Sequence, residues 1–220
     1  MARFGFGGLC HEYDALLLQC APSMVISVLL FSLLGYLSGS LAFSIWITRL
    51  IKGVDLRNSG SGHATATNTI RQVGFGAGAL VLMLDIAKGF LPVWLALRYA
   101  PAMWIVSIAA VCVVVGHCWP VFAQFRGGMG LACAGGCLLA VSPLGFLIAA
   151  AILIFLTLVI HHGARATLVT ALVTAPIYWI FGLRGIEFWI AVPIGILLAY
   201  RSAMDWNRKY RELWLDRERT

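Results

Sequence analysis

The feature that most constrains this chain is a series of long apolar runs separated by short polar breaks. The run at 143–160 spans 18 residues and contains no charged residue. The others lie at about 24–50, 76–97, 101–116, 131–141, 167–182 and 186–200. A helix needs about 20 apolar residues to cross a hydrocarbon core of about 30 Å. The runs are continuous and lack the alternation of a membrane β-barrel. We therefore predict an all-α integral membrane protein, a bundle of about seven transmembrane helices.

The composition agrees with a membrane protein. Of the 220 residues, 61% are hydrophobic and 11% are charged, whereas a soluble domain has about 25% charged residues. The net charge is +7, but no basic face with interleaved aromatic residues is present, so we expect no nucleic-acid partner. The cysteines include no Cys-x-x-Cys pair. We expect neither a metal nor a cofactor.

The basic residues predict how the chain lies in the membrane. Twelve of the 16 fall on the face that holds the C-terminal tail and the breaks at 51–75, 117–130 and 161–165, and three fall on the other face. Lys and Arg accumulate on the cytoplasmic side. This pattern predicts cytoplasmic motif loops, an outside N-terminus and a cytoplasmic C-terminus. The predicted organisation is an interfacial arm (1–22), a membrane domain (23–200) and a charged cytoplasmic tail (201–220).

The break at 51–75 contains a polar segment rich in glycine, serine, threonine and asparagine. Gly60 and Gly62 allow backbone N–H groups to turn toward an anion. Ser61 and Thr67 add hydroxyl donors, and the forked guanidinium of Arg71 suits phosphate. The segment is typical of an anion-binding loop. It is also typical of a flexible turn whose arginines only set the topology.

The break at 117–130 has a similar character. Arg126 is followed by Gly127, Gly128 and Gly130 at the start of an apolar run, and backbone amides at a helix N-terminus favour an anion. His117 is either a general base or a polar residue satisfied at a helix end. These features predict a second anion site on the same face as the first.

Asp85 and Lys88 are three residues apart within the second run, so they share one helix face. Ionisable groups at membrane depth are costly and are usually paired or functional. This pair either contributes to a site or forms an ion pair that only locks the packing. Thr157, Thr170 and Thr174 are expected to form hydrogen bonds between helices.

Together these motifs resemble those of the acyl-phosphate:glycerol-3-phosphate acyltransferases (PlsY). The first motif, G-S-G-N-x-G-A-T-N-x-x-R, is matched by Gly60-Ser61-Gly62, Ala66-Thr67-Asn68 and Arg71. The stretch L-D-x-x-K-G is matched by residues 84–89, and the second motif, G-H-x-F-P-V-F-x-x-F-K/R-G-G-K-G-V-A, resembles residues 116–132. The resemblance covers about 41–200.

The resemblance implies an enzyme of phospholipid synthesis in the bacterial inner membrane. Such an enzyme moves a fatty acyl group from acyl phosphate to glycerol 3-phosphate among membrane lipids. By position, the catalytic residues would be Ser61, Arg71 and His117. The substrate-binding residues would be Gly60, Gly62, His63, Thr67, Asn68, Asp85, Lys88, Arg126, Gly127, Gly128 and Gly130. His63 or His117 would supply proton transfer.

The chain departs from the family motifs at several positions. Met129 stands where the family has a lysine, and His63 and Thr65 stand where it has asparagine and glycine. Ser202 and Asp205 fall at the histidine and asparagine of a third motif. Two hypotheses follow: an active acyltransferase, or a catalytically degenerate relative that is a structural or lipid-binding subunit of a larger membrane complex.

Overall fold

The computed structural model describes residues 7–207, and for residues 7–22 it describes only the course of the backbone. Within this range the chain is helical and contains no strand. The α-helices are α1 (Gly7–Gly39), α2 (Phe43–Lys52), α3 (Ala66–Val73), α4 (Phe75–Tyr99), α5 (Met103–Cys118), α6 (Leu131–Val141), α7 (Pro143–Ile160), α8 (Gly163–Ile180) and α9 (Ile186–Ala203). Two 3-10 turns, η1 (Leu56–Asn58) and η2 (Val121–Ala123), lie between them. The all-α prediction is confirmed.

Five segments of the described chain are long and apolar enough to cross a membrane: Ser23–Lys52, Phe75–Tyr99, Met103–Ala123, Pro143–Ile160 and Ile186–Ala203. Helix α6 is apolar but has only 11 residues. The expected count of seven spans therefore stays a prediction. Helix α7 has Gly145 as its one buried residue. Its other side chains are exposed or half-buried, so much of its apolar surface is left to face lipid.

The expected single span at 24–50 is interrupted. Helix α1 ends at Gly39 and α2 begins at Phe43. The Lys88 ammonium donates to the carbonyl of Leu41 at 2.7 Å, and the Ser38 hydroxyl donates to the carbonyl of Lys88 at 2.8 Å. A break in a membrane helix exposes backbone groups that need partners. Because a side chain of α4 supplies one of them, the sequence of the span alone did not reveal the break.

Pairs of glycines bring the long helices into contact. A Cβ at Gly39 would lie 2.0 Å from a backbone carbonyl oxygen of α5, and one at Gly116 would lie 2.2 Å from a carbonyl oxygen of α1. Gly89 of α4 and Gly136 of α6 form the same reciprocal arrangement, at 2.1 Å each. Small residues let membrane helices pack at short distance. Gly35 and Gly39 thus form the surface on which α1 contacts α5.

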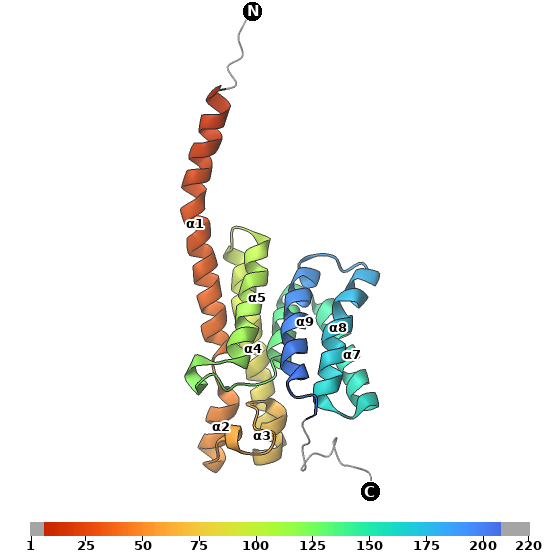
Figure 1. The fold of residues 1–220 in the computed structure, drawn as a ribbon. Coiled ribbons are helices and arrows are strands. Elements are labelled where there is room, and N and C mark those ends of the chain that lie inside the picture. Colours follow the sequence, from red (N-terminus) through yellow and green to blue (C-terminus); the bar gives the residue numbers. More distant parts are fainter. Residues whose placement is uncertain (1–6, 208–220) are drawn as a thin grey trace, which may run out of the picture.

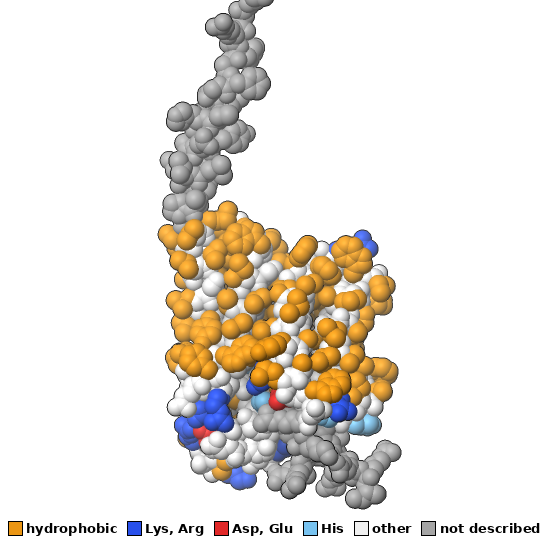
Figure 2. Space-filling model, in the orientation of Figure 1, with side chains coloured by type: hydrophobic (Ala, Val, Ile, Leu, Met, Phe, Trp, Pro, Cys, Tyr) orange, Lys and Arg blue, Asp and Glu red, His pale blue; other side chains and the backbone are white. Residues whose placement is uncertain are grey.

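The polar breaks gather at one end of the bundle. Helices α2 and α3, the turn at 119–130, the α7–α8 connection and the end of α9 lie there, while the α4–α5 and α8–α9 connections lie at the other end (Figure 1). Figure 2 shows apolar side chains over the helical part of this view, with charged and histidine side chains concentrated toward the same end as α2 and α3. The predicted convergence of the three breaks is confirmed.

Candidate active site

The first polar loop is held in shape by the side chain of Asn68, which has no exposed surface. Its amide nitrogen lies 3.0 Å from the carbonyls of Ser59 and His63 and 3.3 Å from that of Leu56. Its oxygen accepts from the N–H of Ser61 at 3.3 Å. All of these partners belong to the loop itself. Asn68 therefore positions the loop, and a direct contact with substrate stays a prediction.

Gly60 and Thr65 allow this loop to continue into the start of α3. Gly60 has a φ of +56° and lies against the Asn68 side chain, so a side chain there would be strained and obstructed. Thr65 has an extended backbone (φ −128°, ψ 155°), and its hydroxyl caps α3 by accepting from the N–H of Asn68 at 3.2 Å. Threonine at 65 is thus compatible with the loop, because this position needs no glycine conformation.

The second loop is paired with the end of α5. The N–H of Gly127 donates to the carbonyl of Cys118 at 3.2 Å, and that of Gly128 donates to His117 at 3.1 Å. The carbonyl of Gly127 accepts from the N–H of Ala64 in the first loop at 3.4 Å. The amides of Gly127 and Gly128 are therefore used within the fold. What remains to face an anion is the start of α6, where the first N–H groups lack helical partners.

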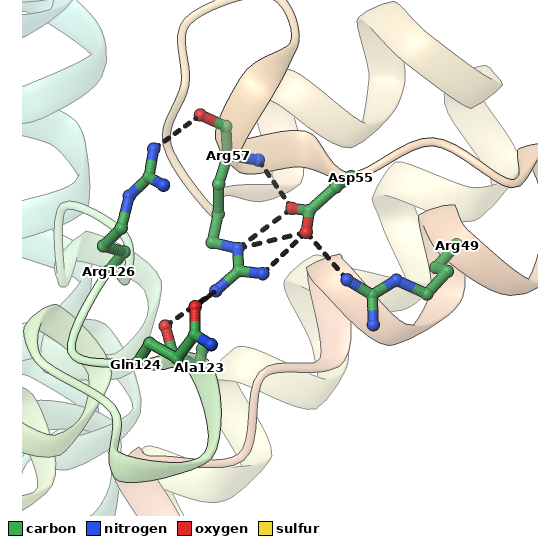
Figure 3. Close-up of polar contacts among 6 residues, drawn as sticks. All are labelled: Arg49, Asp55, Arg57, Ala123, Gln124 and Arg126. Atoms are coloured by element: carbon green, nitrogen blue, oxygen red, sulfur yellow. Dashed lines mark hydrogen bonds and ion pairs between the residues drawn. The ribbon is translucent and has the colours of Figure 1, made fainter.

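A cluster of arginines ties the outer parts of the two loops together (Figure 3). Arg57 forms an ion pair with Asp55 at 2.7 Å and donates to the carbonyl of Ala123 at 3.0 Å. Arg126 donates to the carbonyl of Arg57 at 3.0 Å, and Arg49 also pairs with Asp55 at 2.7 Å. The hydrogen bonds from Arg57 hold the pKa of Asp55 well below its ordinary range. Arg126 thus contacts the first loop through one guanidinium nitrogen, and its expected contact with phosphate stays a prediction.

A cavity of about 540 Å³ begins at these loops and extends among the helices. Its polar end is lined by Ser61, His63, Thr65, Thr67, Arg71, Asp85 and His117, and by Gly130, Leu131 and Ala132 at the start of α6. Its remaining wall is mostly apolar and comes from α4, α6, α7, α8 and α9. Thr170 and Thr174 lie in this wall, but their hydroxyls donate to carbonyls of α8 itself. The expectation that these two bond between helices is therefore wrong.

The Asp85–Lys88 pair is buried and has a mixed role. The two side chains meet at 2.8 Å. Asp85 lines the cavity, whereas Lys88 lies outside the lining and holds the break between α1 and α2. Nδ1 of His117 lies 3.9 Å from the Asp85 carboxylate, beyond hydrogen-bond distance. His117 also lines the cavity at the end of α5.

A second group of polar side chains joins the first loop to the end of α9. Nε2 of His63 lies 2.7 Å from a carboxylate oxygen of Asp205, and Nδ1 lies 3.3 Å from a guanidinium nitrogen of Arg201. Arg201 also donates to the carbonyl of Gly128 at 3.4 Å. Helix α9 continues to Ala203, so Arg201 belongs to the helix that ends at the site. Sequence reasoning had assigned Arg201 only to the charged tail.

The structure divides the expected site residues into two groups. Those that line the cavity are Ser61, His63, Thr67, Arg71, Asp85, His117 and Gly130. Those outside the lining are Gly60, Gly62, Asn68, Lys88, Arg126, Gly127 and Gly128. Each catalytic candidate is in the first group. Lys88 holds the break between α1 and α2, and the other members of the second group belong to the two loops or to the start of α3.

Comparison with known proteins identifies the family. The model of the family described as glycerol-3-phosphate acyltransferase matches residues 29–211. The chain belongs to this family. A glycerol-3-phosphate acyltransferase of Bordetella petrii is 37% identical over 185 residues, which cover 83% of this chain and 86% of that relative. One of Myxococcus xanthus is 47% identical over 119 residues, or 54% of this chain and 62% of that protein.

Solved structures of glycerol-3-phosphate acyltransferases have the same fold. A crystal structure of PlsY, an integral membrane glycerol 3-phosphate acyltransferase, in its glycerol 3-phosphate form is 35% identical, with a TM-score of 0.75 over 83% of this chain and 91% of that one. The lysophosphatidic acid form is 33% identical, with a TM-score of 0.73 and the same coverage. The predicted membrane fold and the resemblance to the family are both confirmed.

Proposed function

We propose that this protein transfers a fatty acyl group from acyl phosphate to the 1-hydroxyl of glycerol 3-phosphate, a step of phospholipid synthesis. The observation that carries the proposal is the shape of the cavity. Its polar end, with Arg71 and the starts of α3 and α6, opens into an apolar space between helices. An acyl phosphate has the same division into a charged head and an apolar chain, and the product of the transfer shares it.

The polar end has separate features suited to two phosphates. Helices α3 and α6 both begin at the cavity, and helix N-termini favour anions. Thr67 and Arg71 lie one turn apart on α3 and both line the cavity. We assign one phosphate to this side of α3, beside Ser61, and the other to the start of α6. The acyl chain would then lie along the apolar wall of α4, α6, α7 and α8.

The reaction joins the acceptor oxygen to the acyl carbon and releases inorganic phosphate. Negative charge develops on the carbonyl oxygen as the acceptor attacks, and preorganised donors at that position lower the barrier. Ser61 and Arg71 are donors at the polar end of the cavity, and we assign this role to them. Met129 lines the same cavity and supplies no charge, so the cationic contribution there falls to Arg71.

We place the protein as a multi-pass protein of the bacterial inner membrane, with the polar end on the cytoplasmic side. The N-terminus would be outside and the C-terminus cytoplasmic, as the excess of basic residues predicts. In this arrangement a water-soluble acceptor enters from the cytoplasm and the acyl donor from the lipid. The proposed division into arm (1–22), membrane domain (23–200) and tail (201–220) follows the same orientation.

The alternative, a catalytically degenerate subunit of a larger membrane complex, has less support. Its motivation is Met129, Ser202 and Asp205 at positions where the family motifs have other residues. However, Ser61, Arg71 and His117 all line one cavity with a polar end and an apolar wall. An assembly subunit has no need of that combination. Recovery of the protein only with stoichiometric partner proteins would favour the alternative.

The test is acyl transfer by the purified protein, given palmitoyl phosphate and labelled glycerol 3-phosphate. We expect labelled lysophosphatidic acid from the native protein and a loss of about 100-fold or more in kcat/KM for Arg71→Ala, since removal of one charge-stabilising donor costs that much in other enzymes. Arg98→Ala is the matched control, because Arg98 is exposed near the opposite end of α4. If the native protein forms no product above Arg71→Ala, the proposed function is wrong.

A further inference from the structure

The short helix α2 has an inverted pattern of burial. Two of its three buried residues are polar, Ser44 and Thr48, whereas the side chains of Trp46 and Leu50 are 42% and 87% exposed. Apolar area left in water is costly, and an exposed apolar patch marks contact with a membrane or with another protein. Helix α2 lies at the polar end of a membrane-spanning bundle (Figure 1). We therefore place its apolar face at the boundary of the bilayer.

The turn η2 adds to this apolar surface. Phe122 and Phe125 are 53% and 58% exposed. A pocket of about 170 Å³ lies between α2 and η2, and its lining includes Trp46 and Phe122. Tryptophan is enriched where a membrane protein passes from hydrocarbon to water. The pocket is thus placed at the depth of lipid headgroups, and it shares no lining residue with the cavity of the candidate active site.

The charged residues in the lining of this pocket are two arginines, Arg49 and Arg57. Both pair with Asp55 at 2.7 Å (Figure 3), and Asp55 itself is not part of the lining. Two guanidinium groups and one carboxylate leave a net positive charge. Arg49 uses one nitrogen for Asp55, and its side chain is 56% exposed. Since a guanidinium has five N–H donors, Arg49 keeps donors for an anion.

We propose that this pocket binds the phosphate group of an anionic phospholipid of the surrounding bilayer, with Arg49 as the main ligand. A guanidinium matches two oxygens of a phosphate at once. The first carbons of the lipid chains then cover the exposed rings of Trp46 and Phe122. A free phosphate ion satisfies the charge but leaves both rings in water, so a lipid fits the two features together. The site does not depend on acyl transfer by the protein.

The pocket is connected to both polar loops. Arg57 donates to the carbonyl of Ala123 beside η2, and Arg126 of the second loop donates to the carbonyl of Arg57. Arg49 belongs to α2 and meets Arg57 through their shared carboxylate. A phosphate bound by Arg49 in this pocket adds a further link between α2 and the first loop. Bound lipid therefore slows local opening of the segment 55–58.

The test compares the affinity of the detergent-purified protein for phosphatidylglycerol and phosphatidylcholine with the same brominated acyl chains, which quench tryptophan fluorescence. Salt at about 0.5 M screens charges that are not in direct contact. We expect native protein to bind phosphatidylglycerol at least about tenfold more tightly, as one hydrogen bond between charged groups provides. Arg49→Gln removes that bond and should reduce the ratio to below about threefold. Lys52→Gln is the matched control and should keep the native ratio, because Lys52 has the same charge on the same helix but lies outside the lining.

Hydrogen–deuterium exchange gives a second readout that needs no variant. Phosphatidylglycerol, but not phosphatidylcholine, should slow exchange at 55–58 in the native protein. Equal affinities of the native protein for the two lipids, or an equal loss of preference in Lys52→Gln, would overturn the proposal. Protection of 55–58 by inorganic phosphate at the same concentration would assign the pocket to the free ion instead. A dimer that Trp46→Ala converts to a monomer would assign the apolar face to a second copy of the chain.

Discussion

Replacement of Asn68 by alanine should open the first polar loop without unfolding the helical bundle. The Asn68 side chain is fully buried and lies within 3.0–3.3 Å of four backbone groups of the loop. The amide nitrogen has two hydrogens and can donate two full hydrogen bonds, and the amide oxygen accepts one more. Replacement by alanine therefore removes at most three full hydrogen bonds. At about 1 kcal/mol for each bond, the loss is about 3 kcal/mol of the free energy that keeps the loop closed. This corresponds to about a 100-fold larger open population.

Hydrogen–deuterium exchange of the detergent-purified protein measures that population directly. We expect the amides of 57–64 to exchange about 100-fold faster in Asn68→Ala, while those in the middle of α5 keep native rates. Acyl transfer should fall in parallel, because Ser61 and His63 lie in the opened loop. Asn58→Ala is the matched control, since Asn58 belongs to the same region and is exposed. Exchange in Asn68→Ala within threefold of this control would refute the assignment of Asn68 as the residue that holds the loop.

Three further variants test the packing and the charges by thermal unfolding in detergent. Gly136→Val should destabilise the protein by about 1–3 kcal/mol, because even a Cβ would lie 2.1 Å from a backbone carbonyl of α4. The control is Gly76→Ala, whose Cβ meets open space and which should be neutral or stabilising. Equal effects of the two variants would contradict the close contact. Lys88→Met should cost about 3–5 kcal/mol by leaving Asp85 buried and uncompensated, and Asp85→Asn in the same chain should restore part of the loss; no recovery would argue against the ion pair. Asp55→Asn should lower the melting temperature at pH 7. This difference should shrink progressively below about pH 4, because the stability that a carboxyl with a lowered folded-state pKa contributes is complete above its unfolded pKa and is lost as the pH falls toward its folded-state pKa. A difference independent of pH would exclude the charge as its cause.

Much of the helical layout could be predicted because it depends on local properties. The expected run at 131–141 coincides with α6, and the following run begins at Pro143, as expected. Ser142 caps that helix by accepting from the N–H of Gly145 at 3.1 Å, a local contact typical of a helix start. The break after Gly39 was missed, because the group that satisfies it is Lys88 of another helix.

The candidate site was predicted unevenly for the same reason. Glycines and hydroxyls in the first loop marked the polar end, and Ser61, Arg71 and His117 all line the cavity. Arg126 was predicted to bind phosphate from its residue type, whereas the structure shows its guanidinium donating a hydrogen bond to the carbonyl of Arg57. The direction of a long side chain depends on the partners that folding brings near, which local spacing does not encode.

By itself, then, the sequence determined that this chain is a helical membrane protein of the acyltransferase family with polar loops on one face. The length of an apolar run and the spacing of a motif are properties of consecutive residues, so the order of the residues is enough to identify them. Only the tertiary structure decided which of the polar residues meet. His63 and Asp205 are unremarkable as separate departures from a motif. In the structure, Nε2 of His63 lies 2.7 Å from the Asp205 carboxylate and both side chains are shielded from water. They meet because the segment that follows α9 packs against the first polar loop, which is distant in sequence.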